Sequence, residues 1–198
     1  SLARKSITGL NLLPAAGNYI YDTSVVTKSF DVALEDEDIV INVNTFNGDN
    51  TKSDALHSLE EMISLYPNLD SISVITTWYG DTDNPDMVIK PRLDLEEPDA
   101  VFNVDWVCGS YDRSNTPETT TNAQGGANQG GTPGDTGLVE FVQECNSRGI
   151  KVMLYPFLQM DTANKGWRGE IPFTSKSDID TWWSQYEPFI RHYSQLFA

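Results

Sequence analysis

The chain has 198 residues, 39% of them hydrophobic and 11% aromatic, which is typical of a folded globular domain and not of a disordered chain. With 29 acidic and 13 basic residues, the formal net charge of −16 argues against nucleic acid as a direct partner, because phosphate backbones repel such a surface. No apolar run approaches the roughly 20 residues of a membrane span, and no secretion signal opens the sequence, so no membrane insertion is expected.

Residues 1–38 are expected to be an extended segment that leads into the first regular element. The first strand is predicted over residues 39–46, whose early positions are almost all apolar, as in a buried parallel strand. An amphipathic helix is predicted to follow from about Ser53 to Tyr66, where Pro67 and Asn68 end it.

A second strand is predicted from Ser71 to Trp78, and a long segment separates it from the next helix. Residues 79–134 are rich in aromatic residues, carboxylates and glycine, and a loop of that length in a compact domain is usually functional or disordered. Residues 100–107 alternate like a strand, so part of this insertion is expected to be ordered β structure. Asp135 is predicted to cap the second helix, which carries Cys145 on its apolar stripe.

A third strand is predicted over residues 150–157, followed after another loop by a third helix. Ser177 and Asp180 resemble a capping box for this helix, and Pro188 is expected to kink or restart it. Its wide aromatic stripe is explained by core packing better than by a ligand site.

Three strand–helix repeats predict an α/β fold with a parallel sheet, specifically a partial or truncated TIM-type (β/α) barrel with extra β structure in the insertion. Residues 39–198 are then the first part of a barrel domain, because no fourth strand precedes Ala198. The functional loops of such a sheet follow the strands.

Several phrases, in the same order along the chain, resemble the TIM-barrel-like domain of gene transfer agent and phage tail proteins. They span nearly the whole chain: Leu12–Gly17 with Tyr21–Thr23, Thr77–Asp81, Gly130–Asp135, Tyr155–Asp161 and Trp167–Gly169. The resemblance implies a glycoside-hydrolase-like domain in the tail-tip or baseplate protein of a phage-like particle, made in the bacterial cytoplasm. It also implies other tail or baseplate proteins and an envelope polysaccharide as partners. Glycosidases of this broad class place their main carboxylates after the fourth and later strands, which this chain does not reach.

Glycoside hydrolysis needs two carboxylates on either side of the scissile bond. Asp81 and Asp161 each follow a predicted strand and are the candidate catalytic residues, although both also fit turn-capping roles. Asp105 is a third acidic candidate if its short strand folds over the same end of the sheet.

Aromatic faces offer apolar area to the C–H bonds of sugars, and guanidinium groups can orient anionic sugars. For each of these residues, core packing or a structural ion pair is the alternative. The candidate substrate-binding residues, together with Asp105, are Trp78, Tyr79, Trp106, Arg113, Tyr155, Trp167 and Arg168.

No metal site and no cofactor are predicted. Asp81, Asp83 and Asp86 depart from the spacing of a calcium-binding loop, and the glycines of residues 125–134 lack the ending of a phosphate-binding loop. His57 and His192 both lie on predicted helices, which gives a histidine-based site little support.

Two hypotheses remain open. The domain either binds or cleaves envelope polysaccharide, or it is a structural and docking module that kept the barrel without the chemistry. An unpaired edge of the half-sheet or the aromatic helix also offers a surface through which the chain could form a homodimer.

Overall fold

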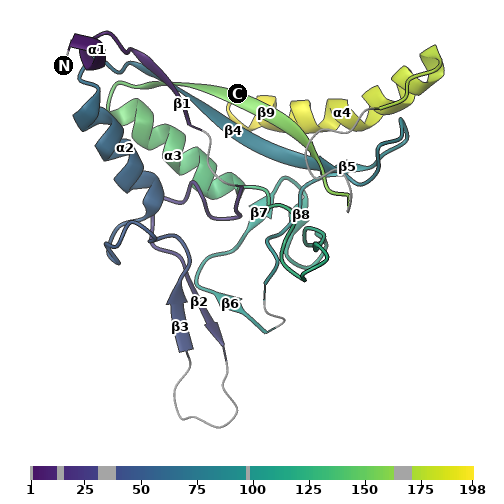
Figure 1. Ribbon diagram of the computed structural model, residues 1–198, viewed down its shortest axis with the longest axis horizontal. Coiled ribbons are helices and arrows are strands. Elements are labelled where there is room, and N and C mark those ends of the chain that lie inside the picture. The colour runs from purple at the N-terminus through teal and green to yellow at the C-terminus, as the bar shows by residue number, and fades with distance from the viewer. Residues whose placement is uncertain (1, 13–15, 31–38, 97–98, 163–170) are drawn as a thin grey trace.

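The structure is a computed structural model that describes residues 2–12, 16–30, 39–96, 99–162 and 171–198. Its centre is a sheet in which β4 (Ser71–Gly80) lies between β1 (Gly9–Leu12) and β9 (Lys151–Met160), all three parallel. The two-residue strand β5 (Ile89–Lys90) adds to the carboxyl end of β4 in the antiparallel sense. The sheet of the described residues is open and does not close into a barrel (Figure 1).

Three helices alternate along the chain with the parallel strands: α2 (Asp54–Leu65), α3 (Asp135–Ser147) and α4 (Lys176–Leu196). A one-turn helix, α1 (Leu2–Lys5), precedes β1. The predicted limits of α2 are confirmed, since Ser53 is its N-cap and Tyr66 its C-cap. None of the described helices combines the length and apolar character that a bilayer crossing requires.

The predicted first parallel strand is wrong. Residues 39–42 form β3 (Ile39–Asn42), which pairs antiparallel with β2 (Thr27–Phe30), and this hairpin projects from the body of the molecule (Figure 1). Val40 is 62% exposed, so the apolar run that suggested a buried strand lies largely in solvent. The first parallel strand is instead β1, which lies in the segment that was expected to lead into the domain. Its four residues are too few to show the alternation of apolar and polar residues that marks a strand.

The helix termini differ from prediction in detail. Gly134, not Asp135, is the N-cap of α3, and the capping box of α4 is formed by Ser175 and Asp178 instead of Ser177 and Asp180. The helix continues through Pro188 over its whole length. Both shifts are small: the N-cap of α3 is a glycine without a side-chain cap, whereas Ser175 caps α4 because a serine near a helix start can supply the capping oxygen.

The insertion after β4 holds several short β elements. Residues 100–107 do not form one strand: β6 (Val101–Phe102) joins β2, whereas β7 (Val107–Cys108) pairs with β8 (Tyr111–Asp112). A bridge between Leu93 and Glu118 ties the insertion together near β5. The insertion therefore contributes to two small sheets beside the central one.

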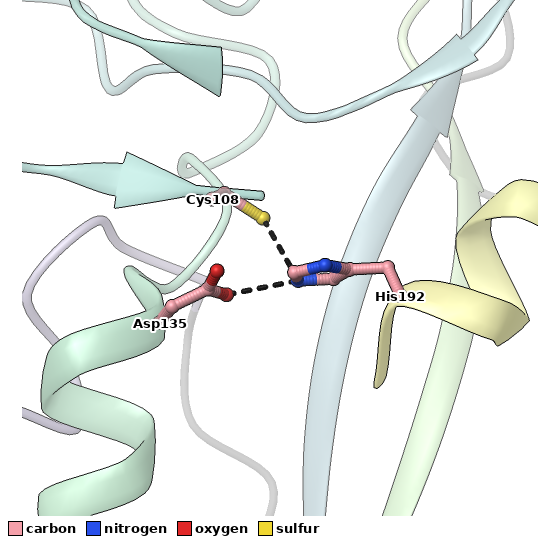
Figure 2. A group of neighbouring side chains, drawn as sticks. All are labelled: Cys108, Asp135 and His192. Atoms are coloured by element: carbon pink, nitrogen blue, oxygen red, sulfur yellow. Dashed lines mark hydrogen bonds and ion pairs between the residues drawn. The ribbon is translucent and has the colours of Figure 1, made fainter. Parts of the chain in front are cut away.

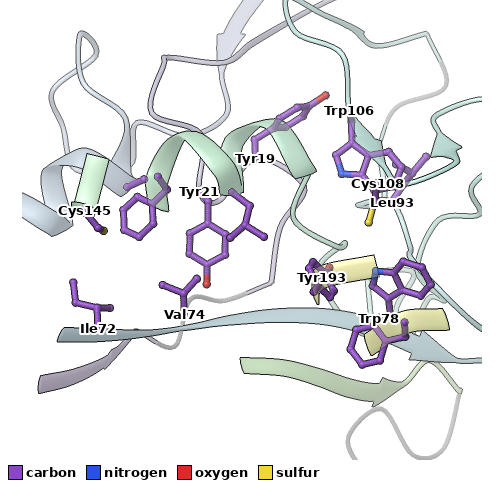
Figure 3. Packing of buried hydrophobic residues seen from close by; sticks show 14 of the residues in the cluster. Tyr19, Tyr21, Ile72, Val74, Trp78, Leu93, Trp106, Cys108, Cys145 and Tyr193 are labelled. Atoms are coloured by element: carbon purple, nitrogen blue, oxygen red, sulfur yellow. The ribbon is translucent and has the colours of Figure 1, made fainter. Parts of the chain in front are cut away.

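The two faces of the central sheet differ. Ile72, Val74 and Trp78 of β4 point toward the helices and are at most 4% exposed. Tyr21 fills the space between α3 and Val74, and its hydroxyl donates to the carbonyl of Ile75 at 2.7 Å (Figure 3). On the other face, Ser73 and Ile75 lie beside Met153 and Tyr155 of β9, which are 63% and 47% exposed. We call this second surface, with Asn11, the open face.

Candidate functional site

The loops that follow the parallel strands gather at the carboxyl end of the sheet, where the ligand sites of parallel α/β folds lie. Asp161, directly after β9, is 3% exposed and accepts a hydrogen bond from Nε of Arg92 at 2.9 Å. The backbone N–H and the hydroxyl of Thr120 donate to the same carboxylate at 2.9 and 2.8 Å. This buried ion pair fixes the insertion to the end of the sheet.

A second polar cluster closes the same end of the sheet. Asn18, which is fully buried, donates its side-chain amide to the carbonyls of Arg92 and Thr132. The carboxylate of Asp94 accepts from the backbone N–H groups of Asn18 at 2.7 Å and Gly131 at 2.6 Å. A Cβ atom at Gly131 would lie 2.3 Å from the Asn18 amide nitrogen, so only glycine fits there. The loops that contain Asn18, Asp94 and Gly131 are therefore held together by direct hydrogen bonds.

A pocket of about 300 Å³ opens beside this cluster, next to the start of α2. Its most exposed lining residue is Phe46, with 86% of its surface in solvent. Three carboxylates also line it: Asp54 at the start of α2, and Asp94 and Glu96 after β5. The walls are completed by Ala16, Gly17, Tyr19, Ile20, Val43 and Asn44.

Each carboxylate of the pocket already accepts hydrogen bonds. Asp54 accepts from the backbone N–H groups of Phe46 at 3.0 Å and Asn47 at 2.8 Å, and Glu96 pairs with Lys28 at 2.8 Å. Carboxylate oxygens accept hydrogen bonds, so these groups can serve as acceptors for hydroxyl groups. Each oxygen of Asp94 accepts one N–H and has a second lone pair for a ligand, whereas Oδ1 of Asp54 already accepts from both the backbone and the side-chain amide of Asn47.

The two predicted catalytic residues lie in different surroundings. Asp161 is buried in its ion pair with Arg92, whereas Asp81 is exposed and accepts from the backbone N–H of Val88 at 2.8 Å. The contact of Asp81 is local, as the turn-capping alternative expected, whereas the partners of Asp161 are tens of residues away and form a buried ion pair instead of a turn cap. The catalytic role of either residue stays a prediction.

Of the predicted aromatic platforms, three are buried. Trp78 is 4% exposed and packs on Phe189 of α4, with ring centroids 5.4 Å apart. Tyr79 is fully buried and donates its hydroxyl to the carbonyl of Gly130, while Nε1 of Trp106 donates to the carbonyl of Thr132 at 2.9 Å. Tyr155 alone among the described aromatic candidates is exposed, on the open face.

The remaining candidates are scattered. Asp105 is exposed, and the guanidinium of Arg113 lies over the Phe102 ring at 3.9 Å and donates to the hydroxyl of Tyr19 at 3.1 Å. Trp167 and Arg168 lie outside the described residues. The pocket residues Phe46, Asp94 and Glu96 were missed, because Phe46 was assigned to a buried strand and the two acids show no diagnostic spacing.

A cluster of potential metal ligands was also missed. The thiol of Cys108, a carboxylate oxygen of Asp135 and a ring nitrogen of His192 all lie within 4.8 Å of one another (Figure 2). Burial raises the pKa of the Cys108 thiol well above its usual range, and the nearby Asp135 charge raises it further. Cys108 and Asp135 are 27 residues apart, and Asp135 and His192 are 57 residues apart. Such wide spacing forms no motif that could have indicated this cluster from the sequence.

The mixed α/β fold with a parallel sheet, its loops joined at the carboxyl end, fits a glycoside-hydrolase-like domain. Residues 99–198, half of the chain, match the model of Glycoside Hydrolase Family 113, and the chain belongs to this family. No curated protein matches the chain.

Proposed function

We propose that this glycoside-hydrolase-like domain binds a cell-envelope polysaccharide in the pocket beside Phe46, as part of the tail tip or baseplate of a phage-like particle. Membership of a glycoside hydrolase family supports glycan interaction. The resemblance of the sequence phrases supports the tail-tip setting, tail proteins as neighbours, and synthesis in the bacterial cytoplasm. The observation that carries the proposal is the nearly fully exposed Phe46 ring at a pocket lined by carboxylates.

The pocket combines the two kinds of contact that a neutral sugar requires. The exposed ring of Phe46 offers an apolar face with a negative quadrupole to the C–H bonds on one side of a pyranose. Asp94 and Glu96 offer oxygen acceptors to the hydroxyl groups at its rim. An anionic sugar is disfavoured, because the chain carries a net charge of −16 and this pocket is lined by three acids.

Titration of the chain with neutral envelope glycans by isothermal calorimetry tests this proposal. Phe46→Ala should weaken binding by about 1–2 kcal/mol, a factor of about 5–30, because it removes the stacking face. Phe46→Tyr keeps the ring and is the matched control, with affinity within about twofold of the wild type. Equal affinity of Phe46→Ala and the wild type would contradict binding at this pocket.

Cleavage requires more than the pocket supplies on its own, because a general acid must hold a proton near neutral pH. The pocket acids all accept from N–H groups or a lysine, so none of them is a free carboxyl group facing the pocket. If Asp81 and Asp161 are the catalytic pair, Asp81→Asn should abolish release of reducing ends from envelope glycans while leaving the fold intact. Retained release in Asp81→Asn would remove that residue from the reaction.

The second proposal is a structural and docking module without chemistry, favoured by the burial of Asp161 in its ion pair. It predicts that Asp81→Asn leaves particle infectivity unchanged, whereas Trp78→Ala, in the core, abolishes assembly. In the same proposal the chain forms a homodimer through the open face, where Met153 and Tyr155 are 63% and 47% exposed.

A further inference from the structure

Three side chains from separate parts of the fold meet on the helix-covered side of the sheet. Cys108 comes from β7 in the insertion, Asp135 is the first residue of α3, and His192 lies near the end of α4 (Figure 2). The cysteine is fully buried, and the side chains of the other two are 14% exposed. Segments far apart in the sequence therefore present a sulfur, an oxygen and a nitrogen to one point.

His192 makes two close contacts through a single ring nitrogen. Its Nε2 lies 2.9 Å from Oδ1 of Asp135 and 3.7 Å from Sγ of Cys108. If Nε2 carries a proton, it donates to the carboxylate and has no lone pair for the thiol. If it carries none, it accepts from the thiol and then faces the carboxylate oxygen lone pair to lone pair. Either tautomer therefore uses only one of the two contacts of Nε2 well, whereas a cation at the centre would be bound by the nitrogen, the oxygen and the sulfur together.

The surroundings support ligation. The other carboxylate oxygen of Asp135 accepts from the backbone N–H of Gly109 at 2.7 Å, which leaves Oδ1 directed at the imidazole. Gly109 has a φ of 61°, and a Cβ atom there would lie 3.2 Å from Nδ1 of His192, so the loop needs glycine at this approach.

Two buried donors beside the cluster have no partner. The indole nitrogen of Trp78 and the hydroxyl of Tyr193 make no hydrogen bond to any described residue, although these side chains are 4% and 2% exposed. The Trp78 ring lies 5.5 Å from the His192 ring, and the Tyr193 ring lies 4.7 Å from it. Such donors are costly when buried alone and are well placed to stabilise a thiolate or a bound water.

We propose that Cys108, Asp135 and His192 form a Zn²⁺ site that ties α4 to the insertion and to the start of α3. A tetrahedral zinc ion with ordinary bond lengths separates nitrogen and sulfur ligands by about 3.6 Å, and nitrogen and oxygen ligands by about 3.4 Å. The observed 3.7 Å already fits, and the 2.9 Å contact has to widen by about half an ångström. A water molecule completes the fourth position from the partly exposed side.

Zinc titration of the whole chain against a competing chelator, with metal analysis of the dialysed protein, tests the site. The wild type should bind one Zn²⁺ per chain. Cys108→Ala and His192→Gln should weaken binding at least about 100-fold, because loss of a ligand costs more than loss of an outer-shell partner. Cys145→Ala is the matched control. It removes the other fully buried thiol, which lies near the end of α3 and outside the cluster, so this variant should bind zinc like the wild type.

Two further measurements keep the test decisive if one variant folds poorly. Co²⁺ should give a thiolate-to-metal absorption band in the wild type and in Cys145→Ala but not in Cys108→Ala. Asp135→Asn keeps an acceptor for the Gly109 N–H and should fold, yet bind zinc more weakly. Absence of stoichiometric zinc in the wild type, or equal affinity in a folded His192→Gln, overturns the proposal.

Discussion

The two faces of the central sheet are made from the same strands, but helices cover one face and the other is exposed to solvent. On the covered face, Trp78 packs against α4, and Ile72 and Val74 pack beneath α3. On the open face, Met153 and Tyr155 remain in solvent. A parallel sheet usually buries both faces, so the open face is the unusual one.

The difference teaches where stability and recognition reside in this molecule. Covered-face residues are held from several sides, which makes them sensitive to any change of volume. Open-face residues contribute little to folding and are available for contact with another surface. The carboxyl end of the sheet combines both properties, since it holds the buried Arg92–Asp161 pair and also the pocket with the exposed ring of Phe46.

The largest expected effect comes from Trp78→Ala on the covered face. Loss of the buried ring should lower the free energy of unfolding by about 3–5 kcal/mol, because α4 cannot collapse fully into the space. The matched change on the open face, Tyr155→Ala, should cost less than about 1 kcal/mol. Urea unfolding followed by circular dichroism measures both, and equal losses would contradict the contrast between the faces.

Asp161→Asn should cause the second-largest loss of stability. It leaves the Arg92 guanidinium buried beside a neutral partner, which should cost about 3 kcal/mol. Asp81→Asn, at an exposed carboxylate that accepts one backbone hydrogen bond, should cost about 1 kcal/mol or less. A loss at Asp81 as large as that at Asp161 would show that the buried pair is not what fixes the insertion.

The covered side also contains a carboxylate that should oppose stability at neutral pH. Burial, with a smaller contribution from the Glu140 charge, raises the pKa of Asp22 from 3.8 to about 7. The folded state then holds a proton that the unfolded state has released, so the free energy of unfolding falls as the pH rises from 3.8 to about 7.

Asp22→Asn should remove this dependence and raise stability at pH 8 by on the order of 2 kcal/mol, with little change at pH 4. Unfolding experiments at both pH values measure it, with Asp105→Asn as an exposed control. If the difference in the free energy of unfolding between the wild type and Asp22→Asn is the same at both pH values, the raised pKa of Asp22 is contradicted.

The smallest expected effect on stability belongs to Met153→Lys on the open face, which should lie within about 0.5 kcal/mol of the wild type. If the chain forms a homodimer through this face, the same change should convert it to a monomer in light scattering after size exclusion. A wild-type chain that is already monomeric would rule out that dimer.

Strong local patterns predicted much of the fold. The strands that became β4 and β9 and all three long helices were located within a few residues, because their apolar periodicity agrees with their burial. The first parallel strand was assigned to residues 39–46, since an apolar run looks the same whether it forms a central strand or an exposed hairpin. The candidate site was harder: Trp78 and Trp106 have the residue type of a sugar platform, but their burial depends on helices and loops far away in sequence.

By itself, the sequence determined the α/β class, the parallel order of its two long strands, and the resemblance to glycoside-hydrolase-like domains, because these depend on periodicity and on local phrases. Only the tertiary structure decided that Phe46 lies exposed at a pocket, that Asp161 is paired with Arg92, and that Cys108, Asp135 and His192 meet. These are contacts between residues tens of positions apart. Such contacts depend on how the insertion and α4 pack on the sheet, and no local pattern carries that information.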